Sequence, residues 1–461
     1  MRPWPILSLL LVLLLALALA RPIDHDESQY VAAAVLSAKG LLPYRDYAYL
    51  QTPLQPLLFA PVAALAGAWT WPALRLLNAL LGWAAVAATF VVARRAAAGE
   101  RAALIAALGF TACDILLFSA AMARNDALPA AMLAGAMVLI AGPPTRARRF
   151  VAGLLLAGAA AAKVSYALPA AAYGVWTLLD RRERPGWVAA GAVLPAAVVL
   201  WLWWLAPADF VFGVLTFPAQ APADYYADRP WKLSLAAKAI DTLKFLALGP
   251  ALIATFLVVR ERVGRGPWVW LAGAGLVAAL LPEPTWRQYL LPTLPPLFVL
   301  AALAIERRPA GRGLRIAAAV FVVAGLAPSL IALFGGTGIV AAMQERTAIA
   351  AALDGENGEI ATLSPQFVAN PDPRFATGPF AWRIRRFLLA DDEVPRRVVT
   401  PRTLAAQFGT RPPAAILVGG EGKWTSGDDA LERQMEAWAK GQGWRRVPVS
   451  ERFRLWLPSG S

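Results

Sequence analysis

The sequence contains very few of the side chains that soluble enzymes commonly use for metal binding and nucleophilic catalysis. Its 461 residues include one cysteine, Cys113, and one histidine, His25. A single thiol excludes a disulfide framework and a zinc site made of cysteines. A single imidazole excludes a Cys–His dyad built on a second histidine.

Hydrophobic residues, in contrast, make up 58% of the chain, and the mean hydropathy is +0.53. Ordinary soluble domains contain about 45–50% apolar residues, and disordered chains contain fewer. The composition therefore predicts a membrane protein. The formal net charge of +14 agrees with this, because excess arginine in a hydrophobic chain marks cytosolic loops rather than a nucleic-acid partner.

Eleven apolar segments predict transmembrane helices, because about 20 helical residues cross the hydrocarbon core. They cover residues 4–20, 73–94, 102–119, 127–142, 150–163, 165–180, 187–206, 236–259, 267–281, 289–305 and 316–334. The first segment has the alternative of being a cleavable signal peptide, but the many segments that follow favour a first helix. A single helix over 150–180 is the alternative to the two segments that meet at Lys163.

Arginine clusters predict the orientation of these helices. They lie in every second loop, at residues 94–101, 146–149, 181–184, 260–265 and 307–315. Because such loops are cytosolic, the N-terminus is predicted inside and the chain after about Phe334 outside. The apolar stretch 54–68 must then not cross the membrane, and we interpret it as an interfacial or re-entrant segment.

The predicted first outer loop, residues 21–72, begins with an ionisable cluster. Asp24, His25, Asp26 and Glu27 lie at a membrane boundary, where such a cluster indicates a polar cavity. If residues 26–38 are helical, Asp26 and Tyr30 share a face. The simpler alternative is that Asp24 and Asp26 cap this helix. Asp24, His25 and Asp26 also offer hard ligands to a divalent metal, but consecutive side chains rarely converge on one ion.

Three further predicted outer loops or turns contain charged residues. Arg124, Asn125 and Asp126 directly precede an apolar segment, where Asn125 or Asp126 has the alternative role of a helix N-cap. Lys163 is either a snorkelling lysine at the outer boundary or a cation for an anionic lipid headgroup. Arg287 is a candidate phosphate ligand, because guanidinium groups recognise phosphate through a planar fork.

Aromatic residues accompany these charges in the outer loops, either as interface anchors or as stacking surfaces for a sugar ring. They are Tyr44, Trp231, Trp286 and Tyr289. Arg45 is a further candidate ligand, with the alternative of pairing with the adjacent Asp46.

The order of these motifs resembles a known family. Asp26-Glu27 and Tyr30 come first, followed by Pro43-Tyr44-Arg45-Asp46, Arg124-Asn125-Asp126, Ala162-Lys163-Val164-Ser165-Tyr166 and the segment from Gln288 to Pro296. Over residues 1–335 they are similar to the bacterial GT-C glycosyltransferases, a group that includes protein mannosyltransferase-like enzymes and the lipid A aminoarabinose transferase. Gln51-Thr52-Pro53 departs from the Lys-Pro-Pro-like step of the latter, which puts aminoarabinose transfer to lipid A in doubt.

The resemblance implies an α-helical polytopic membrane protein with the GT-C fold, located in the bacterial inner membrane. It implies transfer of a sugar from a polyprenyl-phosphate donor to a lipid, glycan or protein acceptor on the periplasmic face. Asp26 corresponds to the family's essential acidic residue, Glu27 completes its Asp-Glu pair, and Asp126 corresponds to a second acidic residue. Which sugar and which acceptor are involved does not follow.

The implied mechanism is an inverting displacement with Asp26 as the general base. Lys163, Arg287 and Arg124 would neutralise the departing lipid phosphate. The sugar and lipid-neck pocket would be shaped by Tyr30, Tyr44, Trp231 and Trp286. No metal or other cofactor is required by this scheme, although a divalent metal is compatible with it.

Residues 336–461 differ in composition from the rest and predict a small periplasmic α/β domain. Strands are expected at 360–363, 415–418, 445–449 and 453–457, and helices at 402–408 and 429–440. Gly419-Gly420-Glu421-Gly422 is interpreted as a turn rather than a phosphate loop, because the Gly-Lys-Ser/Thr pattern is missing. The Pro-rich stretch 370–379 is a candidate for contact with the active site.

Two other function classes compete with the glycosyltransferase. A transporter or lipid flippase usually shows internal repeats and charged or broken helices at mid-membrane. We find no clear repeat, and the polar residues gather at the predicted outer boundary. The third class is a non-catalytic subunit of an envelope-assembly complex that keeps the enzyme fold.

Overall fold

The structure is a computed structural model that describes residues 3–264, 266–356, 358–376, 399, 401–420 and 429–459. Contacts divide the chain into two compact units. The first consists of Met1–Arg21, Arg75–Val199 and Trp231–Gly336, and the second of Pro22–Leu74, Leu200–Pro230 and Thr337–Ser461. The second unit therefore combines most of the predicted first outer loop with the predicted C-terminal domain.

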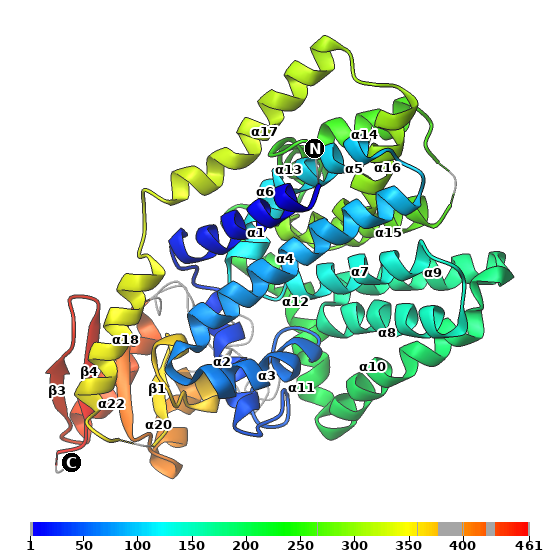
Figure 1. The fold of residues 1–461 in the computed structure, drawn as a ribbon. Coiled ribbons are helices and arrows are strands. Elements are labelled where there is room, and N and C mark those ends of the chain that lie inside the picture. Colours follow the sequence, from blue (N-terminus) through cyan, green and yellow to red (C-terminus); the bar gives the residue numbers. More distant parts are fainter. Residues whose placement is uncertain are drawn as a thin grey trace. The chain divides into compact units, whose positions relative to one another are not determined.

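The first unit is made of helices and the turns between them (Figure 1). Its helices are α1 (Pro3–Ala20), α4 (Thr70–Arg95), α5 (Glu100–Thr111), α6 (Asp114–Ala121), α7 (Ala127–Ile140), α8 (Arg146–Ala162), α9 (Ala167–Leu179), α10 (Pro185–Leu205), α13 (Leu235–Ala247), α14 (Ala251–Arg260), α15 (Pro267–Leu280), α16 (Leu294–Arg307) and α17 (Arg312–Ala332). Short turns of 3₁₀-helix are η2 (Val164–Tyr166), η3 (Arg181–Glu183), η5 (Pro230–Leu233) and η6 (Arg287–Thr293). Helix α4 begins in the second unit, and α10 ends there.

Each predicted apolar segment is helical. By length and composition, five segments of the described chain can cross a membrane, namely Pro3–Ala20, Leu54–Arg95, Pro185–Leu205, Arg287–Arg307 and Arg312–Ala332. The number becomes seven if the pairs α5–α6, bent by 64°, and α13–α14, bent by 96°, each count as one span. The alternative of one helix over 150–180 is wrong, because α8 ends at Ala162 and the chain turns at Lys163. Eleven crossings stays a prediction, as does the interfacial position of 54–68.

The arginine-rich turns lie together at one end of the first unit. Hydrogen bonds connect them, from Gly99 N to Glu306 Oε2, from Arg307 Nη1 to Glu261 O, from Arg95 Nη1 to Val138 O and from Arg184 Nε to Pro144 O. Consecutive helical segments therefore alternate in direction, as the arginine pattern predicts. Arg124, Lys163 and Arg287 belong to the opposite end of this unit.

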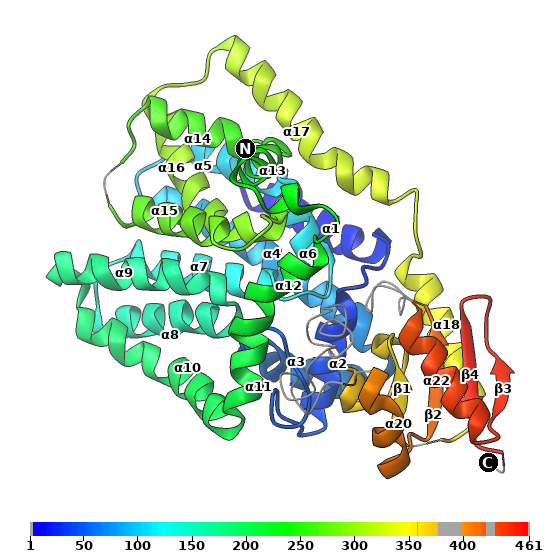
Figure 2. The same ribbon diagram turned by 180° about the vertical axis from the view of Figure 1, so that it is seen from behind.

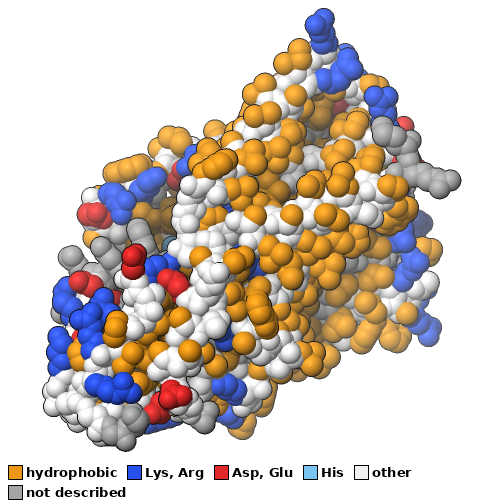
Figure 3. Space-filling model, turned by 60° about the vertical axis from the view of Figure 1, so that its left-hand side comes forward, with side chains coloured by type: hydrophobic (Ala, Val, Ile, Leu, Met, Phe, Trp, Pro, Cys, Tyr) orange, Lys and Arg blue, Asp and Glu red, His pale blue; other side chains and the backbone are white. Residues whose placement is uncertain are grey.

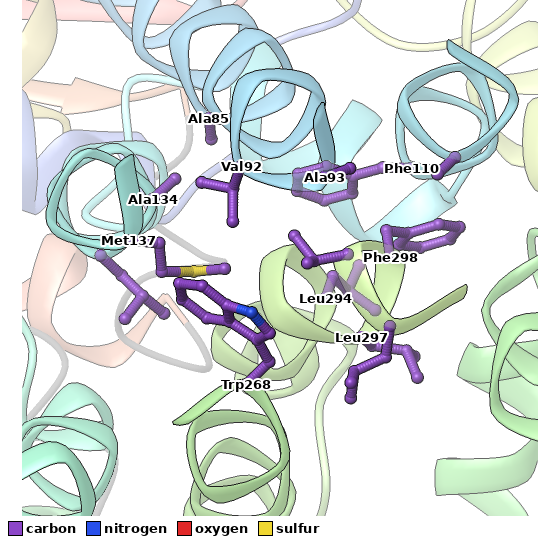
Figure 4. Close-up of a cluster of buried hydrophobic side chains, with 14 of the residues drawn as sticks. Ala85, Val92, Ala93, Phe110, Ala134, Met137, Trp268, Leu294, Leu297 and Phe298 are labelled. Atoms are coloured by element: carbon purple, nitrogen blue, oxygen red, sulfur yellow. The ribbon is translucent and has the colours of Figure 1, made fainter. Parts of the chain in front are cut away.

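The core of the first unit is formed by small and aromatic side chains. Phe110 of α5 stacks on Phe298 of α16, with ring centroids 5.6 Å apart. Figure 4 shows this pair beside Val92 of α4, Met137 of α7 and Trp268 of α15. Many hydrophobic side chains nevertheless remain on the outside, where Figure 3 shows a broad apolar surface with lysine and arginine side chains beyond it. Such a surface fits a lipid environment.

Two helix breaks meet inside the first unit. Asp114, the first residue of α6, donates its backbone N–H to Leu248 O at the break between α13 and α14 (2.9 Å). Gly325 of α17 packs on the same point, because a Cβ there would lie 2.0 Å from Ala112 O and 2.8 Å from Gly249 Cα. The backbone groups freed by one break are thus partly satisfied by the other.

The second unit contains a small α/β domain. The four-stranded sheet has the order β1-β2-β4-β3, with β1 (Ile360–Thr362) parallel to β2 (Ala415–Gly419), and with β4 (Phe453–Leu457) antiparallel to β2 and to β3 (Arg445–Pro448). Helices α20 (Pro401–Thr410) and α22 (Ala430–Gly441) cover one face, and α18 (Ile339–Leu353) lies on the other side (Figures 1 and 2). The predicted strands and helices are confirmed, and Gly419 and Gly420 form a turn with positive φ. Glu421, Gly422 and residues 377–379 lie outside the described residues.

The rest of the second unit packs against this domain. It comprises α2 (Glu27–Ala38), α3 (Leu54–Ala66), η1 (Gly67–Trp69), α11 (Pro207–Val211), η4 (Phe212–Thr216) and α12 (Phe217–Tyr225), and the domain adds η7 (Pro365–Phe367) and η8 (Pro373–Phe375). Ile23 N donates to Thr337 O (2.8 Å), and Lys39 Nζ, at the end of α2, donates to Ala369 O (3.1 Å). The Pro-rich stretch that begins at Asn370 therefore contacts the first outer loop.

Candidate functional site

A buried ion pair lies at the end of the first unit opposite the arginine-rich turns. Lys163 Nζ and Asp126 Oδ1 are in direct contact, and Arg124 Nε lies 3.3 Å from Asp126 Oδ2. Lys163 is 5% exposed and Asp126 1%, so the snorkelling alternative for Lys163 is wrong. Asp126 occupies the N-cap position of α7, but its side chain makes no capping hydrogen bond. The carboxylate is committed to the two cations instead.

Three guanidinium groups surround a single aromatic ring beside this pair. The Cζ atoms of Arg287, Arg124 and Arg21 lie 3.7, 5.1 and 5.3 Å from the centroid of Phe118 in α6. Arginine binds favourably to an aromatic face at such distances, although three like charges around one ring repel each other. The cluster therefore needs negative charge nearby.

Part of that charge comes from Asp114. Its Oδ2 accepts a hydrogen bond from Arg287 Nη1 (2.8 Å), and the residue is fully buried. Asp114 belongs to none of the predicted site motifs, yet a carboxylate within an apolar segment is a signal of function by itself. Arg75 was missed in the same way. It is fully buried in α4 and donates to Ala18 O (3.0 Å) and Arg21 O (2.7 Å), which holds the end of α1 in place.

Cationic and anionic side chains gather in this cluster. The five cations are Arg21, Arg75, Arg124, Lys163 and Arg287, and the two carboxylates are Asp114 and Asp126. Several buried polar atoms here also lack a protein hydrogen-bond partner among the described residues, namely Asp114 Oδ1, Asn125 Oδ1 and Tyr166 Oη. Buried polar atoms of this kind are normally satisfied by water or by a ligand. Guanidinium and ammonium groups beside such atoms are suited to an anionic ligand.

Of the aromatic residues predicted for the site, Tyr289 lies beside the cluster, in η6. Lys163 Nζ is 5.6 Å from the ring centroid of Tyr289, which joins Tyr289 and Arg287 of η6 to the cluster. Trp286, directly before η6, is 44% exposed. Trp231 in η5 is 60% exposed, and Lys232 Nζ lies 4.6 Å from its ring centroid. Both tryptophans keep surface that a ligand can contact.

An apolar groove of about 1010 Å³ runs along α17 in the first unit. Its walls come from α1, α5, α14, α16 and α17, and they include Leu14, Ile105, Leu257 and Ala318. Leu117 and Ser329 line one end, and Arg101 and Arg315 line the other. The 14 residues from Arg315 to Ser329 give a length of about 21 Å along the helix axis.

The Ser329 end of the groove reaches the cationic cluster. Ser329 Oγ accepts a hydrogen bond from Arg21 Nη1 (2.7 Å), and Arg21 is one of the three arginines around Phe118. Leu117, on the same groove wall, directly precedes Phe118. An apolar channel and an anion-attracting cluster are thus continuous in this unit.

The first outer loop forms a separate polar turn in the second unit. Asp24 Oδ1 accepts from Asp26 N (2.9 Å), and Glu27 Oε2 accepts from Asp24 N (2.9 Å). Asp24 and Glu27 therefore stabilise the turn that precedes α2, and Asp24 itself is not the N-cap residue. Asp26 is the N-cap residue by position, yet its side chain makes no capping bond and lies 3.3 Å from His25 Nε2. Asp26 is partly exposed, whereas Glu27 is fully buried.

The other candidate residues of the second unit, Tyr30, Tyr44 and Arg45, mainly make contacts that stabilise the loop itself. Tyr30 is buried in α2. Tyr44, with a φ of 66°, is buried, donates to Gln51 O and packs edge-to-face on Phe210 at 4.9 Å. Arg45 pairs with Asp46 through Nε and Nη2, at 3.0 and 2.7 Å, so the alternative of a local pair is confirmed.

The cluster of potential metal ligands predicted in this loop is also present. Single ligand atoms of Asp24, His25 and Asp26 lie within 4.8 Å of one another. One imidazole and two carboxylates suit a divalent cation. However, three side chains alone do not complete the shell of about six ligands that a hard divalent cation takes.

Comparison with solved structures finds the same fold in ArnT from Cupriavidus metallidurans. The structure of ArnT bound to undecaprenyl phosphate superposes with a TM-score of 0.63, and the apo structure with 0.64. In both cases the identity is 16%, and the match covers 98% of this chain and 97% of ArnT. No protein-family model and no curated protein matches the sequence. The GT-C fold that the motifs predict is therefore confirmed.

Proposed function

We propose that the protein is a membrane glycosyltransferase that moves a sugar from a polyprenyl-phosphate donor to an acceptor. The observation that carries this proposal is the apolar groove that ends beside a cluster of arginine and lysine side chains. A polyprenyl phosphate has the matching structure, with a long apolar tail and one anionic head. The fold shared with ArnT, one structure of which is bound to undecaprenyl phosphate, supports the same ligand class.

The reaction we propose is a single displacement at the anomeric carbon. The carboxylate of Asp26 takes the proton of the acceptor hydroxyl, whose oxygen then bonds to the anomeric carbon. The bond from that carbon to the phosphate oxygen breaks, and polyprenyl phosphate leaves with the electron pair. One displacement inverts the configuration. Neither step needs a metal ion, although Asp24, His25 and Asp26 would offer ligands to one.

The cationic cluster supplies the electrostatic part of catalysis in this proposal. Lys163, Arg124 and Arg287 stabilise the phosphate as its charge develops, and they do so in a buried site where water does not screen them. Trp231 and Trp286 offer stacking surface to the sugar or the lipid neck. Tyr30 and Tyr44 are buried within the second unit, so their role in this proposal is to support the packing of the first outer loop. Asp126, held by Lys163 and Arg124, orients these cations.

We place the reaction on the periplasmic face of a bacterial inner membrane. The arginine-rich turns, which face the cytosol by the positive-inside rule, lie at the end of the first unit opposite the cationic cluster. The N-terminus is then cytosolic. Mass spectrometry of envelope glycans from a deletion strain would identify the sugar and the lipid, glycan or protein acceptor.

The proposal is tested by supplying polyprenyl-phosphate sugars to the purified protein in detergent. Transfer releases polyprenyl phosphate, whereas a transporter, a flippase or a non-catalytic subunit releases none. Asp26→Asn should lose at least 10²-fold in turnover, the usual share of a general base. Asp228→Asn, which changes an exposed carboxylate of the second unit, is the matched control. Full turnover by Asp26→Asn would remove Asp26 from the base role.

A further inference from the structure

The groove along α17 has a second charged end, which the proposed reaction does not use. Arg101 lies in the first turn of α5, and Arg315 in the first turn of α17, and both line the groove. This end belongs to the arginine-rich turns, so it lies about 21 Å from the Ser329 end along the axis of α17. A polyprenyl phosphate has only one anionic head. Arg101 and Arg315 are therefore expected to bind a different anionic ligand.

The two guanidinium groups at this end outnumber the one carboxylate that lines it, Glu306. Within the described ranges, neither Arg101 nor Arg315 makes a side-chain hydrogen bond or an ion pair. The carboxylate that lines the same end, Glu306, accepts a hydrogen bond from Gly99 N (2.9 Å) and so closes the turn before α5. An anion placed between Arg101 and Arg315 would be attracted by both positive charges.

The chemistry of the wall limits what that anion is attached to. Between the two ends the groove is lined almost entirely by apolar side chains, such as Ile105, Leu257 and Ala318. Inorganic phosphate would leave this surface empty, and a nucleotide or sugar would bury polar groups against it at a cost. A phosphodiester with attached acyl chains matches both the charged end and the apolar wall of the groove.

We propose that this end of the groove is a binding site for an anionic phospholipid. The phosphate lies between Arg101 and Arg315, and an acyl chain extends into the groove toward Ala318. Basic pockets between membrane helices commonly select anionic headgroups in this way. The inference does not depend on the proposed function. If both hold, the acyl chain and the donor tail enter from opposite ends and compete for the middle of the groove.

The test measures binding of phosphatidylglycerol to the purified full-length protein in detergent, without any donor, by native mass spectrometry. The double variant Arg101→Gln/Arg315→Gln should bind phosphatidylglycerol about 30-fold more weakly, because two charges near the headgroup are lost. Arg308→Gln/Arg312→Gln is the matched control, since both arginines belong to the same turn and neither lines the groove. Phosphatidylcholine, which has no net charge, should bind weakly to all three proteins.

A third variant separates the headgroup from the chain. Ala318→Trp fills the groove and should weaken the binding of phosphatidylglycerol while leaving Arg101 and Arg315 in place. Equal binding by the wild type and the Arg101/Arg315 variant, or equal binding of the two lipids, would overturn the proposal. Displacement of the lipid by millimolar inorganic phosphate would reduce the site to a simple anion site. If the wild-type protein binds phosphatidylglycerol as expected but transfers no sugar, only the proposed function is contradicted.

Discussion

Asp126 and Lys163 form a buried ion pair that joins the start of α7 to the break between α8 and α9. Neither residue is near the other in the sequence, and neither is exposed. Arg124 shares the same carboxylate. One negative charge therefore holds two positive charges in a part of the molecule with little water.

This arrangement predicts that substitutions of Asp126 and of Lys163 have unequal effects on stability. Asp126→Asn leaves Lys163 and Arg124 without their counter-charge and should cost about 3–5 kcal/mol in the free energy of unfolding. Lys163→Met leaves Asp126 paired with Arg124, so the loss should be smaller. Thermal unfolding of both variants in detergent gives the comparison. Equal losses would mean that Arg124 does not share the carboxylate.

Arg287 should not tolerate replacement by lysine. Its guanidinium both stacks on Phe118 at 3.7 Å and binds Asp114, and an ammonium group cannot reproduce this planar geometry. We expect Arg287→Lys and Arg287→Gln to weaken the binding of polyprenyl phosphate by a similar factor, about tenfold. The exposed Arg229→Gln is the control, and titration of the lipid is the measurement. Full recovery by lysine would show that charge alone matters.

The meeting point of the two helix breaks predicts a steric effect. A methyl group at Gly325 would overlap Ala112 O, so Gly325→Ala should destabilise the protein by about 1–3 kcal/mol or more. Gly313→Ala in the same helix meets nothing within 4 Å and should be neutral or slightly stabilising, because alanine favours helix. Melting temperatures of the two variants test this. A tolerated Gly325→Ala would mean that α17 packs less closely.

Glu432 predicts a dependence of local stability on pH. Burial raises the pKa of this carboxyl, which accepts a hydrogen bond from Gly419 N (2.8 Å). A raised folded-state pKa means that the stabilisation is complete below the unfolded-state pKa and is lost as pH rises through the folded-state pKa. Glu432→Gln keeps the acceptor oxygen, so its local stability relative to the wild type should increase as pH rises above the ordinary pKa of a glutamate.

Hydrogen exchange of the β2 amides in the full-length protein would measure that gain. Protection in Glu432→Gln relative to the wild type should increase with pH after correction for the intrinsic exchange rate. The same substitution at the exposed Glu451 is the control. A constant difference across the pH range would contradict the burial argument.

Much of the helical framework is predictable, because apolar segments near 20 residues long have few other stable forms. The strands of the small domain were found for a similar local reason. The break between α13 and α14 has a recognisable signal in Gly249-Pro250, whereas the break after Thr111 has none. There, the bend depends on packing against Gly325 from a distant helix, which no local pattern contains.

The candidate site, too, could be predicted only in part from the sequence. Arg124, Asp126, Lys163, Arg287 and Tyr289 were found from polar residues at helix boundaries, and the structure brings them together. Asp114 and Arg21 were missed, since their role depends on sharing the Phe118 ring with residues of other helices. Position along the sequence shows that a charge lies near hydrocarbon. It does not show which aromatic ring or carbonyl group the charged side chain contacts.

The composition of the second unit has a consequence for how the protein is made. Its three segments are separated in the chain by long helical stretches, and Ile23 bonds to Thr337, more than 300 residues later. The early segment emerges from the ribosome long before its partners, so it must wait without its final contacts until Thr337 and the residues that follow it have been made. Chaperone dependence should therefore be concentrated in residues 22–74, and a nonsense codon just before Thr337 should be as harmful as one near residue 200.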